Sequence, residues 1–98
     1  MTARPSSVFL RDIIRIALRM EQPDAGRRFL DSVDSTVNQL LARPELGRFR
    51  PEVKAGLRSW PVEVFGNWII FYRVDKESLR LVRLLHGARD LPRALRRE

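Results

Sequence analysis

Few side chains in this 98-residue sequence are of types that do chemistry, and they match no catalytic pattern. There is one histidine, His86, and no cysteine. A metal centre needs several convergent ligands, and nucleophilic catalysis needs an activated nucleophile beside a base, so the sequence predicts neither of them. It also contains no glycine-rich phosphate-binding loop. His86 could act as an acid or base, but a lone histidine beside a glycine at a strand end more often has a structural role.

Arginine is the commonest charged residue in the sequence. Basic residues number 19 against 12 acidic ones, a net charge of +7, and Lys54 and Lys76 are the only lysines. Such a charge indicates an acidic partner, and the planar guanidinium suits bidentate contacts with carboxylate or phosphate. Arg73 and Arg83 are expected on neighbouring strands. There they either form a cationic patch on one face or remain solvated charges and ion pairs.

The elements that position these arginines lie mainly in residues 58–90. Alternating and β-branched apolar residues predict strands at 60–65, 68–74 and 79–85. Gly66-Asn67 is typical of a two-residue hairpin turn, and residues 75–78 form a polar turn. Together these strands make an antiparallel meander. Both faces of its middle strand are mostly apolar, so we expect helices on one face and a half-covered surface near Arg73 on the other.

Two helices are expected before the meander. Apolar residues at helical spacing predict the first at about 7–20, with Ser6 or Ser7 as its N-cap. Besides its inward face, this helix carries a second apolar stripe, Leu10, Ile14 and Leu18, which a second helix or a partner must cover. The next helix begins at Pro23-Asp24 and ends before Pro44.

The remaining segments are shorter. Residues 1–5 are read as a brief edge strand, 45–57 as a loop, and 88–98 as a basic helical turn. The sequence thus predicts one α+β domain over residues 1–98, in which an N-terminal helical hairpin packs on a C-terminal antiparallel sheet in the order β-α-α-β-β-β. No run is long or apolar enough for a signal peptide or a membrane span, so we expect a cytoplasmic location and no membrane contact.

Several blocks of the sequence resemble a known family. NWIIFYRV at 67–74 and LRLVRLLHGARDL at 79–91, with upstream blocks including residues 23–30 and 44–47, are similar in order and spacing to the RelE/ParE superfamily of bacterial type II toxins. The similarity is greatest to the ParE branch and covers nearly the whole chain. It implies a cognate antitoxin, ParD-like and DNA-binding, in a hetero-oligomer with the toxin.

The resemblance also bears on ribonuclease chemistry. The RelE branch cleaves messenger RNA on the ribosome with basic residues on its central strands and a C-terminal tyrosine. Here Trp60 and Val62 stand where lysines would, Ile69 replaces an arginine and Leu95 replaces the tyrosine. Only Arg89 matches. Since cleavage needs a proton acceptor, a proton donor and charge neutralisation together, these residues argue against a nuclease.

The ParE branch implies instead a non-catalytic toxin that binds DNA gyrase. On that reading neither a cofactor nor sequence-specific nucleic-acid recognition is expected, and the target contacts are Arg58, Arg89, Arg93, Arg96 and Arg97. The antitoxin contacts are expected at Phe9, Leu10, Ile14, Leu18, Trp68, Tyr72, Arg73 and Arg83. Two alternatives remain open. One is a ribosome-dependent endoribonuclease built around Arg83, His86 and Arg89, and the other is a diverged member that binds its antitoxin without toxicity.

Overall fold

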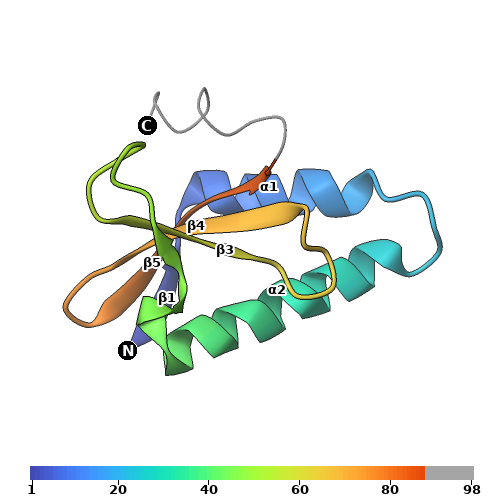
Figure 1. Ribbon diagram of the computed structural model, residues 1–98. Coiled ribbons are helices and arrows are strands. Elements are labelled where there is room, and N and C mark those ends of the chain that lie inside the picture. Colours follow the sequence, from blue (N-terminus) through green and yellow to red (C-terminus); the bar gives the residue numbers. More distant parts are fainter. Residues whose placement is uncertain (88–98) are drawn as a thin grey trace.

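Two helices lie on one face of a five-stranded sheet in the computed structural model, which describes residues 1–87 (Figure 1). The elements follow the order β1 (Thr2–Pro5), α1 (Ser7–Leu18), α2 (Ala25–Ala42), η1 (Pro44–Leu46), β2 (Arg48–Phe49), β3 (Leu57–Pro61), β4 (Trp68–Val74) and β5 (Ser78–His86). The α+β prediction, with a helical hairpin before an antiparallel meander, is confirmed. The predicted basic turn at 88–98 lies outside the described residues.

The helix boundaries follow local chemistry. The Ser6 hydroxyl accepts a hydrogen bond from Phe9 N at 3.0 Å, which satisfies one of the free N–H groups at the start of α1, as predicted. The same hydroxyl donates to Val82 O at 2.9 Å and so ties this end of α1 to β5. Asp24 precedes α2 with a left-handed φ of 63°, a conformation that Asp tolerates better than most residues. The helix ends before Pro44, as predicted.

The sheet has the strand order β1-β5-β4-β3-β2. β1 runs parallel to β5, while the other neighbours are antiparallel, so the sheet is mixed. The short strand β2 was expected to be loop. Gly66-Asn67 forms a turn, closed by Trp68 N donating to Phe65 O at 2.9 Å, but it is not the predicted two-residue hairpin connector. β3 ends at Pro61, so residues 62–67 make a longer connector. Val62 turns into the core there, and its N–H donates to Trp68 O at 2.9 Å.

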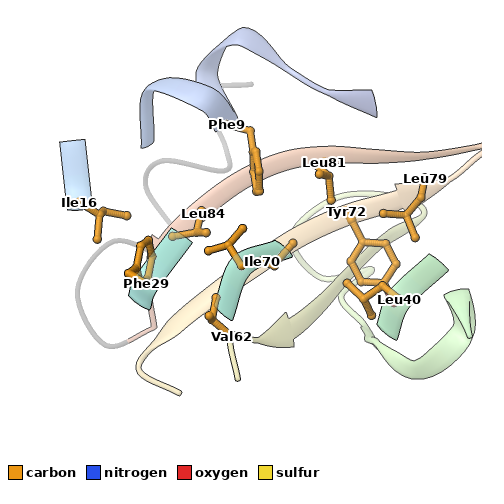
Figure 2. Packing of buried hydrophobic residues seen from close by; sticks show 11 residues of the cluster. Phe9, Ile16, Phe29, Leu40, Val62, Ile70, Tyr72, Leu79, Leu81 and Leu84 are labelled. Atoms are coloured by element: carbon orange, nitrogen blue, oxygen red, sulfur yellow. The ribbon is translucent and has the colours of Figure 1, made fainter. Parts of the chain in front are cut away.

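A register shift in β5 changes which side chains face the helices. Phe71 pairs with Arg83 and Tyr72 with Leu81, so Val82 is an extra residue in a β-bulge. Leu81 and Leu84 consequently both pack in the main core although they are an odd number of residues apart. That core joins the two helices to the sheet through Phe9, Ile16, Phe29, Val33, Leu40, Val62, Ile70, Tyr72, Leu79, Leu81 and Leu84 (Figure 2).

The opposite face of the sheet carries a smaller cluster. Leu57, Phe71 and Leu85 are buried there, and Val53 from the segment between β2 and β3 packs against them. This agrees with the expected partial cover of the second face. Neither α1 nor α2, the helices in the described part of the chain, is long and apolar enough to cross a membrane.

Candidate partner-binding surfaces

The outer face of α1 carries an exposed apolar stripe. Leu10, Ile14 and Leu18 follow one another at intervals of one helical turn and are 47%, 58% and 79% exposed. Phe9 and Ile16, on the opposite side of the helix, are buried in the core. Arg11 and Arg15 are exposed on the same helix, and Arg19 is exposed at its C-cap. We call Leu10, Ile14 and Leu18 the α1 stripe; it is the second apolar stripe expected from the sequence.

Asp12 anchors α1 to the edge of β5. Its carboxylate is 1% exposed and accepts hydrogen bonds from Leu84 N at 3.0 Å and from Arg83 Nε at 2.8 Å. Arg83 Nη2 and Arg15 Nη2 each add a contact of 3.2 Å to the other carboxylate oxygen. β1 pairs with β5 only as far as Leu81, so the Asp12 carboxylate, in place of a neighbouring strand, accepts the hydrogen bond from Leu84 N. The carboxylate also offsets the charge of Arg83. Sequence reasoning matched Asp12 to the family pattern but gave it no structural role. The only signal for such a role is that Asp12 is a lone acid on an otherwise apolar helix face.

Arg73 and Arg83 do not form the shared cationic patch considered from the sequence. Arg83 reaches α1 beside the bulge, whereas Arg73 lies between Leu57 and Arg80 on neighbouring strands and faces the side of the smaller cluster. The Nε atom of Arg73 is buried, and within the described residues it has no hydrogen-bond partner. A buried guanidinium N–H without an acceptor is costly, so this group is suited to donate a hydrogen bond to an oxygen of a partner.

Two of the expected antitoxin contacts belong to the core. Phe9 is 1% exposed and Tyr72 0% exposed, so neither can offer surface to a partner as the domain stands. Phe9 faces inward because α1 has two apolar faces, and only the α1 stripe is left outside. Trp68 is partly buried against the main core, where its ring lies edge-on to His86 at 5.1 Å. His86 is thus placed as a ring contact at the strand end.

Tyr72 holds the segment after α2 against the sheet. Its hydroxyl donates to Pro44 O and accepts from Gly47 N, both at 2.7 Å. Burial raises the pKa of Tyr72 above its usual value, and the Gly47 hydrogen bond and the Arg58 charge oppose that rise. Gly47 is required because a Cβ at this position would meet the tyrosine hydroxyl.

Arg58 strengthens the same segment. Its Nη1 donates to Gly47 O at 2.8 Å and to Glu45 O at 3.1 Å, and its guanidinium lies 3.8 Å from the centre of the Phe49 ring. Arg58 therefore has an internal role, and its contact with a target stays a prediction. Arg89, Arg93, Arg96 and Arg97 lie outside the described residues. Within residues 1–87, no group of three or more His, Cys, Asp or Glu side chains could hold a metal ion.

Both a protein-family model and a curated relative match this chain. Residues 4–91 match the family model of the ParE toxin of the type II toxin-antitoxin system parDE. Toxin ParE3 of Caulobacter vibrioides is 32% identical over 88 residues, which are 90% of this chain and 85% of that protein.

Solved structures show the same fold. A structure of the chromosomal ParDE system from P. aeruginosa gives a TM-score of 0.72 at 17% identity and covers 88% of this chain and 95% of that one. The E. coli DinJ-YafQ complex gives 0.55 at 20% identity, covering 88% and 92%. The family model and the identity to ParE3 together span nearly the whole described structure. This chain therefore belongs to the ParE toxin family of type II toxin-antitoxin systems.

Proposed function

We propose that this ParE-family toxin is neutralised by a cognate, ParD-like antitoxin and that it acts by binding DNA gyrase without catalysing a reaction. The α1 stripe is the observation that carries the antitoxin proposal. Three large apolar side chains one turn apart on an exposed helix face are unusual for a surface helix and fit an amphipathic partner segment.

The surroundings of the α1 stripe specify the chemistry of that segment. Arg11 and Arg15 are exposed on α1 and Arg19 at its C-cap, so an acidic partner gains from them while a basic one is repelled. Arg73 adds a second requirement on the other face of the sheet, where its buried Nε lacks an acceptor within the described residues. A segment that covers the helix and also reaches the sheet would satisfy both. Such a partner is long, extended in part, and acidic.

The side chains that stand at the nuclease positions of the RelE branch argue for binding and against catalysis. Trp60 packs against the main core, Val62 is 1% exposed and Ile69 packs in the smaller cluster. None of these side chains can carry a proton or neutralise a phosphate. Arg83, the first residue of the alternative nuclease set, is held by Asp12 at 2.8 Å. The described part of that set thus offers no side chain placed to move a proton except His86.

The proposal of gyrase as target rests on membership of the ParE family, for which the resemblance implies that target. The test is controlled expression in bacteria with two readouts, supercoiling by gyrase and cleavage of messenger RNA on ribosomes. We expect purified toxin to inhibit supercoiling, and His86→Ala to inhibit equally. Deletion of residues 93–98 should weaken inhibition, because the predicted contacts Arg93, Arg96 and Arg97 are lost.

The same experiment separates the alternatives. Ribosome-dependent cleavage that Arg89→Ala abolishes, with supercoiling unaffected, would overturn the gyrase assignment. Expression that leaves growth unaffected, together with tight antitoxin binding, would identify a diverged member without toxicity. Co-expression of the antitoxin should restore growth, and a chain that stays toxic and unbound in its presence would refute the antitoxin proposal.

A further inference from the structure

Three arginines lie side by side on the face of the sheet away from α1 and α2. Arg4 of β1 pairs with Arg80 of β5, and Arg80 pairs with Arg73 of β4. The residues beside them along each strand pack in or against the main core: Ala3, Leu79, Leu81 and Tyr72. Because side chains alternate across a strand, the three arginine side chains project from the opposite face. We call Arg4, Arg80 and Arg73 the arginine row.

The arginine row costs stability that no contact among the described residues offsets. Neighbouring strands are about 4.8 Å apart, so the row places three positive charges within about 10 Å along the sheet. Like charges directly opposite on paired strands destabilise a sheet. Arg4 and Arg80 are exposed, and within residues 1–87 neither side chain forms an ion pair or a hydrogen bond. Arg73 Nε lacks an acceptor there too. A ligand with several anionic oxygens would remove this cost.

Nearby acidic side chains do not neutralise the arginine row. The turn between β4 and β5, residues 75–77, adds two carboxylates and one lysine, which leaves the row in excess. On the β2 side, Glu52 pairs with Arg50 at 3.7 Å, and Arg48 is exposed on β2. Every other acidic residue of residues 1–87 lies on a helix, between α1 and α2, in η1, or in the connector at 62–67, which is hydrogen-bonded to α2. This face therefore remains positive.

The surroundings of the arginine row distinguish a nucleic acid from a peptide. Leu57 and Phe71, the apolar residues beside Arg73 on this face, are both 0% exposed. Peptide interfaces gain most of their affinity from apolar or aromatic anchors, which the α1 stripe offers and these buried residues do not. Binding of nucleic-acid phosphates is mainly electrostatic, and guanidinium groups contact phosphate oxygens bidentately. Single strands also require aromatic rings on which bases stack, and Phe71 is covered. The row thus fits the backbone of a duplex.

We propose that the arginine row binds the phosphate backbone of double-stranded DNA without reading its sequence. The choice of DNA over RNA rests on the proposed function, in which the target is DNA gyrase. The row would hold the toxin on DNA beside that target. An acidic antitoxin segment that reaches Arg73 would displace DNA from it, because carboxylates and phosphates compete for the same guanidinium.

The test measures binding of the purified toxin to a labelled DNA duplex by fluorescence anisotropy over a series of salt concentrations. Arg80→Gln removes the central charge of the arginine row. The matched control is Arg27→Gln, which removes the same charge from an exposed position on α2. The slope of log affinity against log salt concentration reports the number of phosphates contacted. The melting temperature of each variant is measured alongside.

We expect Arg80→Gln to weaken DNA binding about tenfold, as for a lost hydrogen bond to a charged group. The salt slope should fall by about 1, equally for two duplexes of different sequence. The melting temperature should stay at or above that of wild type, because a repulsion between paired strands is relieved. A merely structural role would instead lower stability and affinity together. Arg27→Gln should keep the slope and stay within about twofold of the wild-type affinity.

Four outcomes would overturn the inference. They are no DNA binding by wild type, equal losses of affinity in Arg80→Gln and Arg27→Gln, tighter binding of an RNA duplex of the same length, and tighter binding of a poly-glutamate peptide of the same charge. Supercoiling assays separate this result from the proposed function. Wild type that binds DNA through Arg80 but leaves supercoiling unaffected would refute gyrase as the target and support the DNA site. Wild type that inhibits supercoiling without binding DNA would refute the DNA site alone.

Discussion

Replacing Asp12 with alanine should release α1 from the sheet edge. The Asp12 carboxylate accepts hydrogen bonds from Leu84 N at 3.0 Å and from Arg83 Nε at 2.8 Å, and the Arg83 side chain is only 14% exposed. With alanine at position 12, Arg83 loses its carboxylate partner and the Leu84 N–H loses its hydrogen-bond acceptor. Removing one partner of a buried pair costs about 3–5 kcal/mol. Since the whole free energy of unfolding of a small domain is about 5–15 kcal/mol, we expect a large fraction of it to be lost.

A double-mutant cycle measured by urea denaturation checks that reasoning. Arg83→Leu removes the charge that Asp12 offsets, so the double variant Asp12→Ala/Arg83→Leu should be more stable than the sum of the single losses by about 1–3 kcal/mol. Asp31→Ala serves as the control, because Asp31 is exposed on α2 and its removal should change stability by no more than about 0.5 kcal/mol. Additive losses across the cycle would show that Asp12 and Arg83 are not energetically coupled, and the argument would fail.

Other changes have equally defined outcomes. Tyr72→Phe leaves Gly47 N and Pro44 O without their hydroxyl partner, so it should cost about 1–3 kcal/mol in thermal unfolding; a neutral result would mean that water replaces the hydroxyl. Because burial raises the pKa of Tyr72 in the folded state, wild-type stability should be complete below the usual value of 10.0 and fall as the pH rises through the folded pKa, a fall that Tyr72→Phe should lack when followed by circular dichroism. Gly47→Ala should destabilise the domain, since the new Cβ meets the hydroxyl and two ring carbons of Tyr72, and the Gly47→Ala/Tyr72→Phe double variant should stay destabilised because phenylalanine keeps those ring carbons. Ile14→Glu should weaken antitoxin binding at least about tenfold in calorimetry while changing the melting temperature little, and unchanged affinity would remove the α1 stripe from the interface.

Local patterns were enough to predict both helices and the meander. The spacing of Phe9, Ile13 and Ile16 predicted the inward face of α1. The spacing of Leu10, Ile14 and Leu18 predicted its second apolar stripe, which is exposed. These features depend on periodicity within one element, which a sequence displays directly. The sequence left open whether a second helix or a partner covers that stripe, and in the structure α2 leaves it exposed.

Features that depend on distant segments could not be predicted in this way. The bulge at Val82 breaks the alternation of β5, so Arg83 could not be assigned to a face from the strand pattern. Tyr72 was expected among the antitoxin contacts, because nothing in its own strand indicates the Pro44 and Gly47 backbone groups that it binds. The turn at Gly66-Asn67 was predicted from a common hairpin signal, but contacts of Glu63 with α2 select a longer connector. In each of these cases tertiary contacts outweighed local preference.

The parallel pairing of β1 with β5 has a consequence for how the toxin is made. Thr2 pairs with Ser78 and Pro5 with Leu81, so β1 leaves the ribosome well before β5, the strand with which it pairs. Closing so long a loop is slow and entropically costly, and it gains nothing until β5 has emerged. The hydrogen bond from Leu84 N to the Asp12 carboxylate likewise cannot form until β5 has emerged. A nascent chain thus carries α1 without its anchor on β5 until β5 has been made. In the proposed function, the α1 stripe is then open to the antitoxin before the sheet is complete.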